Sequence, residues 1–230
     1  MYINDVDIKK YGGKLLDRNI SPNRVSQNYT WEYTLDSPTF YGSALDFKDV
    51  LLYVLFEADS EEIFLKNLGR VSEEFRHGAL VRFKNIDLQY TMYLTQKPDY
   101  ERLNNRFYKV SFVLDGNFGL GERKVCSGTN VSRLTVENNG VYTSPALLTI
   151  KPRAYQSTLT IQGFEKTISL DKINANDIVI VDAESGQITI NGNAGISKYN
   201  SFYLPKVKVG TSTILVSTAS DITVVFSERY

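Results

Sequence analysis

Few side chains in this chain could carry out chemistry. His77 is the only histidine and Cys126 the only cysteine, so a Ser-His-Asp arrangement would have to use His77. His77 follows a predicted helix, where the helix dipole stabilises a protonated imidazole without any catalytic role. A disulfide within the chain is impossible, and a zinc site would depend on carboxylates, an uncommon ligand set. We therefore predict no catalytic residue, no metal site and no cofactor.

Paired carboxylates are the next chemistry to consider. A glycosidase needs two of them flanking the scissile bond. Spacing in the sequence does not bring two acidic residues of the second half to such a separation, and aspartates in the loops of a β protein are common turn formers. We expect turn residues here and predict no hydrolase activity. The residues concerned are Asp171, Asp177, Asp182 and Glu184.

Aromatic residues near the end of the chain could bind a sugar. The candidates for a glycan contact are Tyr199, Phe202 and Tyr203. They lie close in sequence to Asn193 and Asn200, and a sugar site needs an exposed aromatic ring with polar groups beside it. The alternative is that these rings fill the core of a β-sandwich.

Composition narrows the classes of partner. The 230 residues contain 26 Lys and Arg and 26 Asp and Glu, which gives a net charge of +0. Nothing in the bulk charge therefore favours nucleic acid or a membrane surface. No basic stretch leads into an apolar one after Met1, and no apolar run is long enough to span a bilayer. With a single cysteine, the chain is expected to fold in a reducing cytoplasm.

The most apolar segment, Phe47–Phe56, is predicted to be a strand with two apolar faces, because side chains alternate along a strand. One face comprises Val50, Leu52, Val54 and Phe56, and the other comprises Leu51, Tyr53 and Leu55. A strand that is apolar on both faces is covered on both. The cover is either a helix or sheet of the same domain or a neighbouring subunit, so Leu51, Tyr53 and Leu55 are the candidate subunit interface.

A helix is predicted directly after this strand. Asp59 or Ser60 can cap it, and Glu61 or Glu62 lies near the positive end of its dipole. The pair His77-Gly78 can end it, because glycine readily adopts the left-handed conformation. Apolar residues recur between these ends at helical spacing. The predicted buried face comprises Phe64, Leu68, Val71 and Phe75.

Alternating strands, a turn and a linker follow the helix. Apolar residues alternate over Ile86–Leu94 and Tyr108–Leu114, and Lys97–Glu101 is predicted to be a polar turn between them. Asp115–Gly121 has three glycines and no strand period, which indicates a linker. It lacks the Lys-Ser/Thr pair and the helix that follow a phosphate-binding loop. The first predicted domain therefore covers residues 1–125.

The second predicted domain covers residues 126–230 and consists of short strands separated by turn residues, a pattern typical of a β-sandwich. Its candidate strands are Val131–Val136, Ala146–Ile150, Thr158–Ile161, Thr167–Leu170, Asp177–Val181, Gln187–Ile190, Phe202–Val209, Thr213–Val216 and Ile222–Phe226.

The C-terminal part of the chain has a recognisable order of turns and strands. Ile188–Asn193 contains an Asn-Gly turn, whose residues tolerate the positive φ that tight turns require. In Phe202–Pro205, Pro205 is expected at an edge or corner because proline cannot occupy a central strand. A glycine turn in Val209–Ile214 and the strand Ile222–Phe226 come last. In this order the chain resembles the distal tail proteins of long-tailed phages that infect Gram-positive bacteria.

The resemblance extends over nearly the whole chain. Met1–Leu16 is similar to the opening strand and turn of that family, and the strand, Glu-rich helix and alternating strands follow the order of its first domain. Thr143–Ile150 resembles the start of the family's second domain. Val179–Asp182, with Gly186 ahead of Ile188, resembles its central hairpin.

The resemblance implies a structural protein of the virion tail tip that is assembled in the host cytoplasm. The implied fold is mainly β: a ring-forming domain with one α-helix, then a galectin-like β-sandwich. In the family, the first domains form a hexameric ring between the tail tube protein and a tail-associated lysin or fibre protein. The second domain points outward toward receptor-binding proteins. A carbohydrate-binding adhesion module is the alternative function, and a hydrolase is the third.

Overall fold

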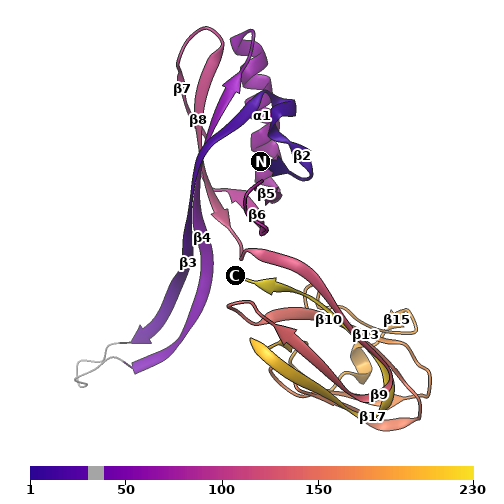
Figure 1. The fold of residues 1–230 in the computed structure, drawn as a ribbon. Coiled ribbons are helices and arrows are strands. Elements are labelled where there is room, and N and C mark those ends of the chain that lie inside the picture. Colours follow the sequence, from indigo (N-terminus) through magenta and orange to yellow (C-terminus); the bar gives the residue numbers. More distant parts are fainter. Residues whose placement is uncertain (31–38) are drawn as a thin grey trace. The chain divides into compact units, whose positions relative to one another are not determined.

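The computed structural model describes the backbone of residues 1–30 and 39–230, and the side chains of residues 1–24 and 47–230. It divides the chain into two compact units, Met1–Gly119 and Leu120–Tyr230 (Figure 1). Each unit has its own hydrophobic core. Among the described residues the fold is mainly β with one α-helix, which confirms the predicted fold class. The division falls slightly before the predicted boundary between residues 125 and 126.

The first unit is built on antiparallel strands in the order β3–β4–β8–β7. Strand β4 is central, so it pairs on both edges: Leu52 lies opposite Arg18 of β3 and opposite Phe112 of β8. The strands and short helix of this unit are β1 (Tyr2–Ile3), β2 (Val6–Asp7), η1 (Ile8–Tyr11), β3 (Gly13–Thr30), β4 (Thr39–Glu57), β5 (Ala79–Arg82), β6 (Gln89–Leu94), β7 (Asp99–Arg102) and β8 (Phe107–Gly116).

The helix α1 (Glu61–Arg76) lies between β4 and β5 and matches its prediction closely. Ser60 caps it, since its hydroxyl accepts a hydrogen bond from the Ile63 amide at 3.3 Å. At the other end Gly78 has φ +88°, the left-handed conformation expected after a helix. The predicted apolar face is buried and comprises Phe64, Leu68, Val71 and Phe75.

Aromatic rings join α1 to the sheet. The ring of Phe64 stacks on Tyr108 of β8, with centroids 3.9 Å apart, and meets Phe56 of β4 edge to face at 5.9 Å. Phe75 contacts Phe112 further along β8, at 5.6 Å. Such pairs add to the stabilisation that area burial provides. One of the two predicted apolar faces of β4 is therefore covered by the helix of its own unit. It is the face that comprises Val50, Leu52, Val54 and Phe56.

Two predictions for the first unit need correction. Lys97–Glu101 is not simply a turn, because Asp99–Arg102 forms the edge strand β7 against β8. All residues of β7 are exposed, so no apolar alternation marks the strand in the sequence. The predicted linker Asp115–Gly121 contains the division between the two units, but it is shorter than expected: β8 ends at Gly116 and β9 begins at Leu120.

The second unit folds around a long antiparallel pair, β9 (Leu120–Asn138) and β17 (Gly210–Arg229). Strand β17 also pairs with β10 and, near Val216, with β11. The Asn191-Gly192 turn was predicted correctly, with φ values of 53° and 80°. The remaining elements are β10 (Ser144–Pro152), β11 (Gln156–Gln162), β12 (Ile168–Ile173), β13 (Val179–Asp182), β14 (Ile188–Ile190), β15 (Asn193–Ala194), η2 (Ile196–Lys198) and β16 (Lys206–Val207).

The predicted strands of the second unit need two corrections. Thr213–Val216 and Ile222–Phe226 belong to one strand, β17, whose register shifts between Leu215 and Ile222. Irregularities of this kind bend a strand without ending it. Of the predicted strand Phe202–Val209, only Lys206–Val207 is a strand, and Pro205 immediately precedes it.

Candidate functional site

One face of the β3–β4–β8 sheet, which we call the outer face, contains the candidate interface residues. Leu51, Tyr53 and Leu55 alternate along β4 with residues that are buried under α1, so they point away from the helix. Each is half-buried. In register, Tyr53 lies between Asp17 of β3 and Ser111 of β8. The structure therefore brings the three predicted residues together on one accessible surface.

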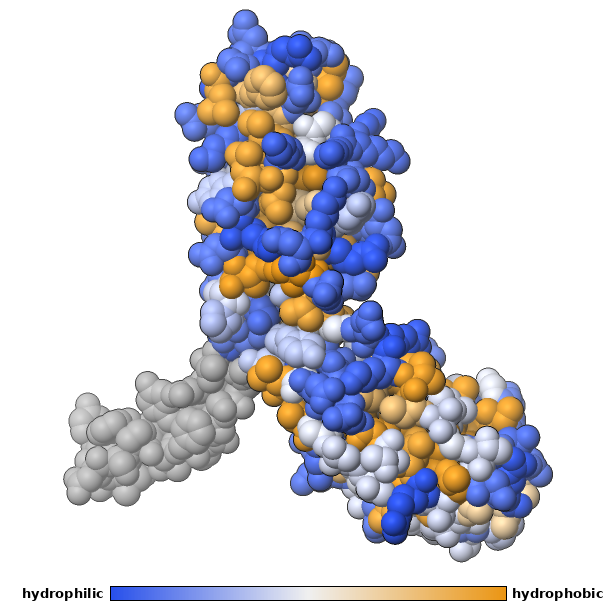
Figure 2. All heavy atoms as spheres, viewed as in Figure 1, coloured by the Kyte–Doolittle hydropathy of each residue, from blue (hydrophilic) through white to orange (hydrophobic). Residues whose placement is uncertain are grey.

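The outer face combines apolar and charged groups. Val113 of β8 lies opposite Leu51 and is 37% exposed. The Lys109 ammonium lies 5.3 Å from the centroid of the Tyr53 ring, a cation–π contact. Figure 2 shows hydrophobic side chains exposed among charged ones over the first unit. A small cavity of about 170 Å³ adjoins Tyr53 and is lined by Asp99, Tyr100, Glu101, Lys109 and Ser111.

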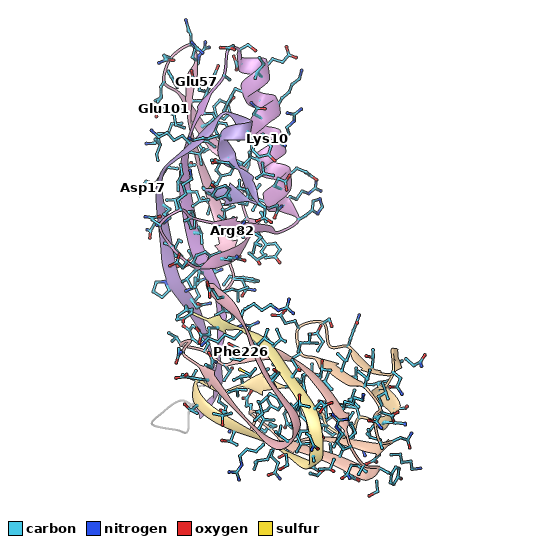
Figure 3. The ribbon with its side chains drawn as sticks, turned by 45° about the vertical axis from the view of Figure 1, so that its right-hand side comes forward. Lys10, Asp17, Glu57, Arg82, Glu101 and Phe226 are labelled. Atoms are coloured by element: carbon cyan, nitrogen blue, oxygen red, sulfur yellow. The ribbon has the colours of Figure 1, made fainter. Side chains whose placement is uncertain are left out.

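A larger cavity of about 640 Å³ lies at the Leu55 end of the outer face. The Arg106 guanidinium bridges two acidic side chains on its wall, at 3.2 Å from Glu57 and 3.1 Å from Asp59. Lys9 and Lys14 also line it. The wall therefore presents one guanidinium shared by two carboxylates beside two lysines, and its apolar lining includes Leu55. Figure 3 labels Asp17, Glu57 and Glu101 on the strands and Lys10 on η1.

The candidate glycan residues of the second unit lie in the loop from Tyr199 to Pro205, but they have different environments. Tyr199 packs against the core, and burial raises the pKa of its hydroxyl to about 12. That hydroxyl donates a hydrogen bond to the Tyr203 carbonyl. Phe202 is 100% exposed and Tyr203 is 53% exposed. Only the last two rings are thus available to a ligand.

Two of the acidic residues that were considered as a glycosidase pair, Asp177 and Asp182, accept hydrogen bonds within their turns. Asp177 accepts bonds from the Asn191 side chain and the Asn174 amide, both at 2.8 Å, and these bonds lower its pKa. The Ser185 hydroxyl and backbone amides likewise lower the pKa of Asp182. A general acid needs a raised pKa instead, and these geometries are those of turns.

The remaining side chains that were considered for chemistry, His77 and Cys126, lie in positions that a structural role explains. His77 lies at the end of α1, where its Nε2 atom is 3.0 Å from Glu73. Cys126 packs beside the core of the second unit. Within residues 1–30 and 39–230, no cluster of three His, Cys, Asp or Glu side chains could hold a metal ion. Over the same residues, no helix is long and apolar enough to cross a membrane.

Sequence reasoning missed several residues around both candidate sites. Val113 was detectable, because the alternation of Tyr108–Leu114 places it on the face opposite Leu114. Leu16, which is 48% exposed, was not detectable from the sequence. It lies at a register irregularity between Leu15 and Asp17, so alternation does not fix its face. Neighbours of Tyr203 such as Lys166 come from a distant loop, which only the fold brings near.

Comparisons with known proteins support a single assignment. Residues 139–230 match the family described as "Siphovirus-type tail component, C-terminal domain". The SPP1 Dit (gp 19.1) crystal structure, described as a paradigm of the hub adsorption apparatus in phages that infect Gram-positive hosts, is similar with a TM-score of 0.79. The match covers 100% of this chain and 98% of that chain at 11% identity. The phage P2 baseplate in its Ca-activated conformation matches with a TM-score of 0.54 and 7% identity, over 97% of this chain and 93% of that chain. A search of curated proteins finds no significant match.

The antiparallel two-unit fold with its single described α-helix is thus the fold of SPP1 Dit. Residues 139–230 are thus similar to the C-terminal domain of the siphovirus-type tail components.

Proposed function

We propose that this chain forms the structural hub at the distal end of a siphophage tail. Six copies close into a ring through their first units. The ring joins the tail tube protein on one side and a tail-associated lysin or fibre protein on the other. The second unit serves as the attachment point for receptor-binding proteins, and assembly takes place in the host cytoplasm. The observation that supports this proposal is the end-to-end fold match with SPP1 Dit, whose description names a hub apparatus.

The first unit offers surfaces suited to a ring. A ring of like subunits needs heterologous contacts, in which one surface meets a different one on the neighbour. The outer face supplies half-buried apolar groups at Leu51, Tyr53 and Leu55, and a neighbour would complete their burial. Interfaces of this kind bury on the order of 1,000 Å² or more, which the outer face and the adjoining cavity at Leu55 together could contribute.

The backbone of the β3–β4 hairpin gives a second reason to expect self-association. Strand β8 pairs with β4 only from Lys48 to Glu57. Beyond Lys48, β3 and β4 continue to pair with each other, from the pair Val25 and Leu45 to the pair Thr30 and Thr39. Among the described strands, no third strand pairs with this part of the hairpin. A two-stranded ribbon is marginally stable alone, so contacts with neighbouring copies would stabilise it.

The deciding experiment places a charge on the outer face in the complete phage. Tyr53→Asp should leave the subunit folded, because Tyr53 is only half-buried, but it should prevent tail completion by putting a carboxylate into the interface. Tyr155→Asp is the matched control, since Tyr155 is 57% exposed in the second unit. Electron microscopy of lysates reports the tails, and circular dichroism of the purified subunits reports folding. Normal tails built from a folded Tyr53→Asp subunit would exclude this interface.

A further inference from the structure

The loop from Tyr199 to Pro205 is anchored on both sides of a fully exposed aromatic ring. Before Phe202, the Asn200 amide donates to the Ser169 carbonyl at 2.9 Å, and the Ser201 hydroxyl accepts from the Ser169 amide at 2.8 Å. The phenylalanine itself is 100% exposed. The Phe202 ring is therefore available to a ligand on a loop that is held in place.

The other side of the loop is equally constrained. The Tyr203 carbonyl accepts the hydrogen bond from the Tyr199 hydroxyl, and Leu204 packs against the core of the second unit. Pro205 is buried, and its carbonyl accepts from the Ala146 amide at 2.9 Å. The loop therefore presents Phe202 from a fixed backbone, and a pre-organised aromatic anchor loses little entropy on binding.

A cavity of about 310 Å³ lies beside this ring. It is bounded by Glu165, Lys166, Phe202, Tyr203, Leu204 and Lys206. The Lys166 ammonium lies 5.7 Å from the centroid of the Tyr203 ring, and no carboxylate in the described part of the chain forms an ion pair with it. Lys206 lies 3.9 Å from Glu165, the only acidic residue of the lining. The site therefore has a net positive charge in a chain whose overall net charge is +0.

We propose that Phe202, Tyr203, Lys166 and Lys206 form a binding site for an anionic polysaccharide. The C–H face of a sugar ring would stack on the exposed aromatic, and the ammonium groups would contact a carboxylate or phosphate substituent. Tyr199 is a positioning residue, because its hydroxyl holds the loop and its ring lies against the core. This inference concerns the second unit alone and does not depend on ring closure by the first.

The size and polarity of the site favour a sugar over a protein. The cavity is at the lower end of ligand-pocket volumes, about 300–1,000 Å³, and its rim consists of lysines and a glutamate. A protein interface would need a wider apolar centre around Phe202. The anionic substituent could be a uronate carboxylate or the phosphodiester of a sugar-phosphate polymer, and the two sources can be distinguished by separate probes.

The test is calorimetric titration of the full chain with polygalacturonate, with a glycerol-phosphate polymer, and with dextran as the uncharged comparison. At least one anionic polymer should bind. Its affinity should fall as the salt concentration is raised, because salt screens exposed charges. Phe202→Ala should weaken that binding about tenfold or more, as for a central aromatic anchor, and Phe202→Tyr should retain it. The double variant Lys166→Ala, Lys206→Ala should bind the anionic polymer no more tightly than dextran. The polymer that binds identifies the substituent.

Matched controls separate this site from a general surface effect. Tyr155→Ala removes an exposed ring and Arg133→Ala an exposed cation elsewhere in the same unit, and both should bind normally. Failure of both anionic polymers to bind, or an equal loss in Tyr155→Ala, would overturn the proposal. So would Phe202→Ala virions that bind polymer normally but lack a receptor-binding protein, because the loop would then be a protein contact.

Discussion

At the scale of single residues, the most unusual group is Glu228, a nine-tenths buried carboxylate in β17. Burial alone would raise its pKa, but hydrogen bonds from Lys124, the Asn139 amide and the Tyr230 hydroxyl outweigh burial, so its pKa lies below the usual 4.5. The Asn139 and Tyr230 bonds are 2.7 and 2.8 Å long. The hydrogen bond to Glu228 correspondingly raises the pKa of Lys124.

Stability should therefore depend on pH through Glu228. A carboxyl whose pKa is lowered by folding stabilises the folded state above its unfolded pKa, and this stabilisation is lost as the pH falls through the folded value. Glu228→Gln should reduce the free energy of unfolding by about 1–3 kcal/mol at neutral pH. The difference from the unmodified chain should shrink below pH 4.5, which urea denaturation can follow. Glu122→Gln, at an exposed position, should differ little at any pH; a Glu228→Gln deficit that stays constant on acidification would contradict the prediction.

At the scale of elements, the helix and the strands it covers were predictable because their apolar residues follow a clear period. Leu68 illustrates this, since the spacing from Phe64 to Phe75 placed it on the buried face, and it is 9% exposed. In β4, the alternation of Val50 to Phe56 was equally clear.

Leu68→Ala tests the packing of α1. We expect the free energy of unfolding to fall by about 2–5 kcal/mol, because the change removes buried methyl groups and leaves a cavity. Leu65→Ala lies on the same helix but at a position 46% exposed, and it should change stability by less than about 0.5 kcal/mol. Thermal or urea denaturation measures both, and similar effects for the two variants would show that the packed face is misassigned.

The elements that sequence reasoning missed lack such a period. In β7 every side chain is exposed, so its polar residues look like a turn. The first part of β9 has glycine at 121 and 128 and charged residues between them, which hid a strand that is held by pairing with β17. Around Phe202, the apolar residues suggested a strand, but this segment is a loop and the Phe202 side chain is in solvent. Pairing partners and loop anchors far away in sequence decided these cases.

The same limit applies to the candidate sites. The outer face of β4 followed from alternation, because Leu51, Tyr53 and Leu55 share a face by period alone. The loop of the second unit required the fold, since Lys166 and Tyr203 are far apart in sequence and meet where the Glu165 amide donates to the Lys206 carbonyl at 3.0 Å. Sequence could name the aromatic residues there, but it could not separate the half-buried Tyr199 from the fully exposed Phe202.

At the scale of the whole molecule, the two units should be separable. Each has its own core, and only residues 117–119 lie between β8 and β9. Residues 1–119 and 120–230, expressed as separate fragments, should each unfold cooperatively. Limited proteolysis of the intact chain should cut within 117–119 in preference to β9, because these residues lie outside the strands and no ladder of strand pairing has to open before they are cleaved. A fragment that shows no unfolding transition would indicate that its core depends on the other.

The pairing of β9 with β17 also constrains the order in which the protein can fold. These strands open and close the second unit in sequence: Leu120 lies opposite Arg229, and Val131 lies opposite Ser220. Contacts between residues so distant in sequence slow folding, because a long loop must close before they form. On the ribosome, the first unit can complete its core while the second is still being synthesised, but β9 must wait for β17 to emerge. Until β17 has emerged, the long edge of β9 is open to other chains, so this interval of synthesis is the one in which the second unit is most exposed to aggregation.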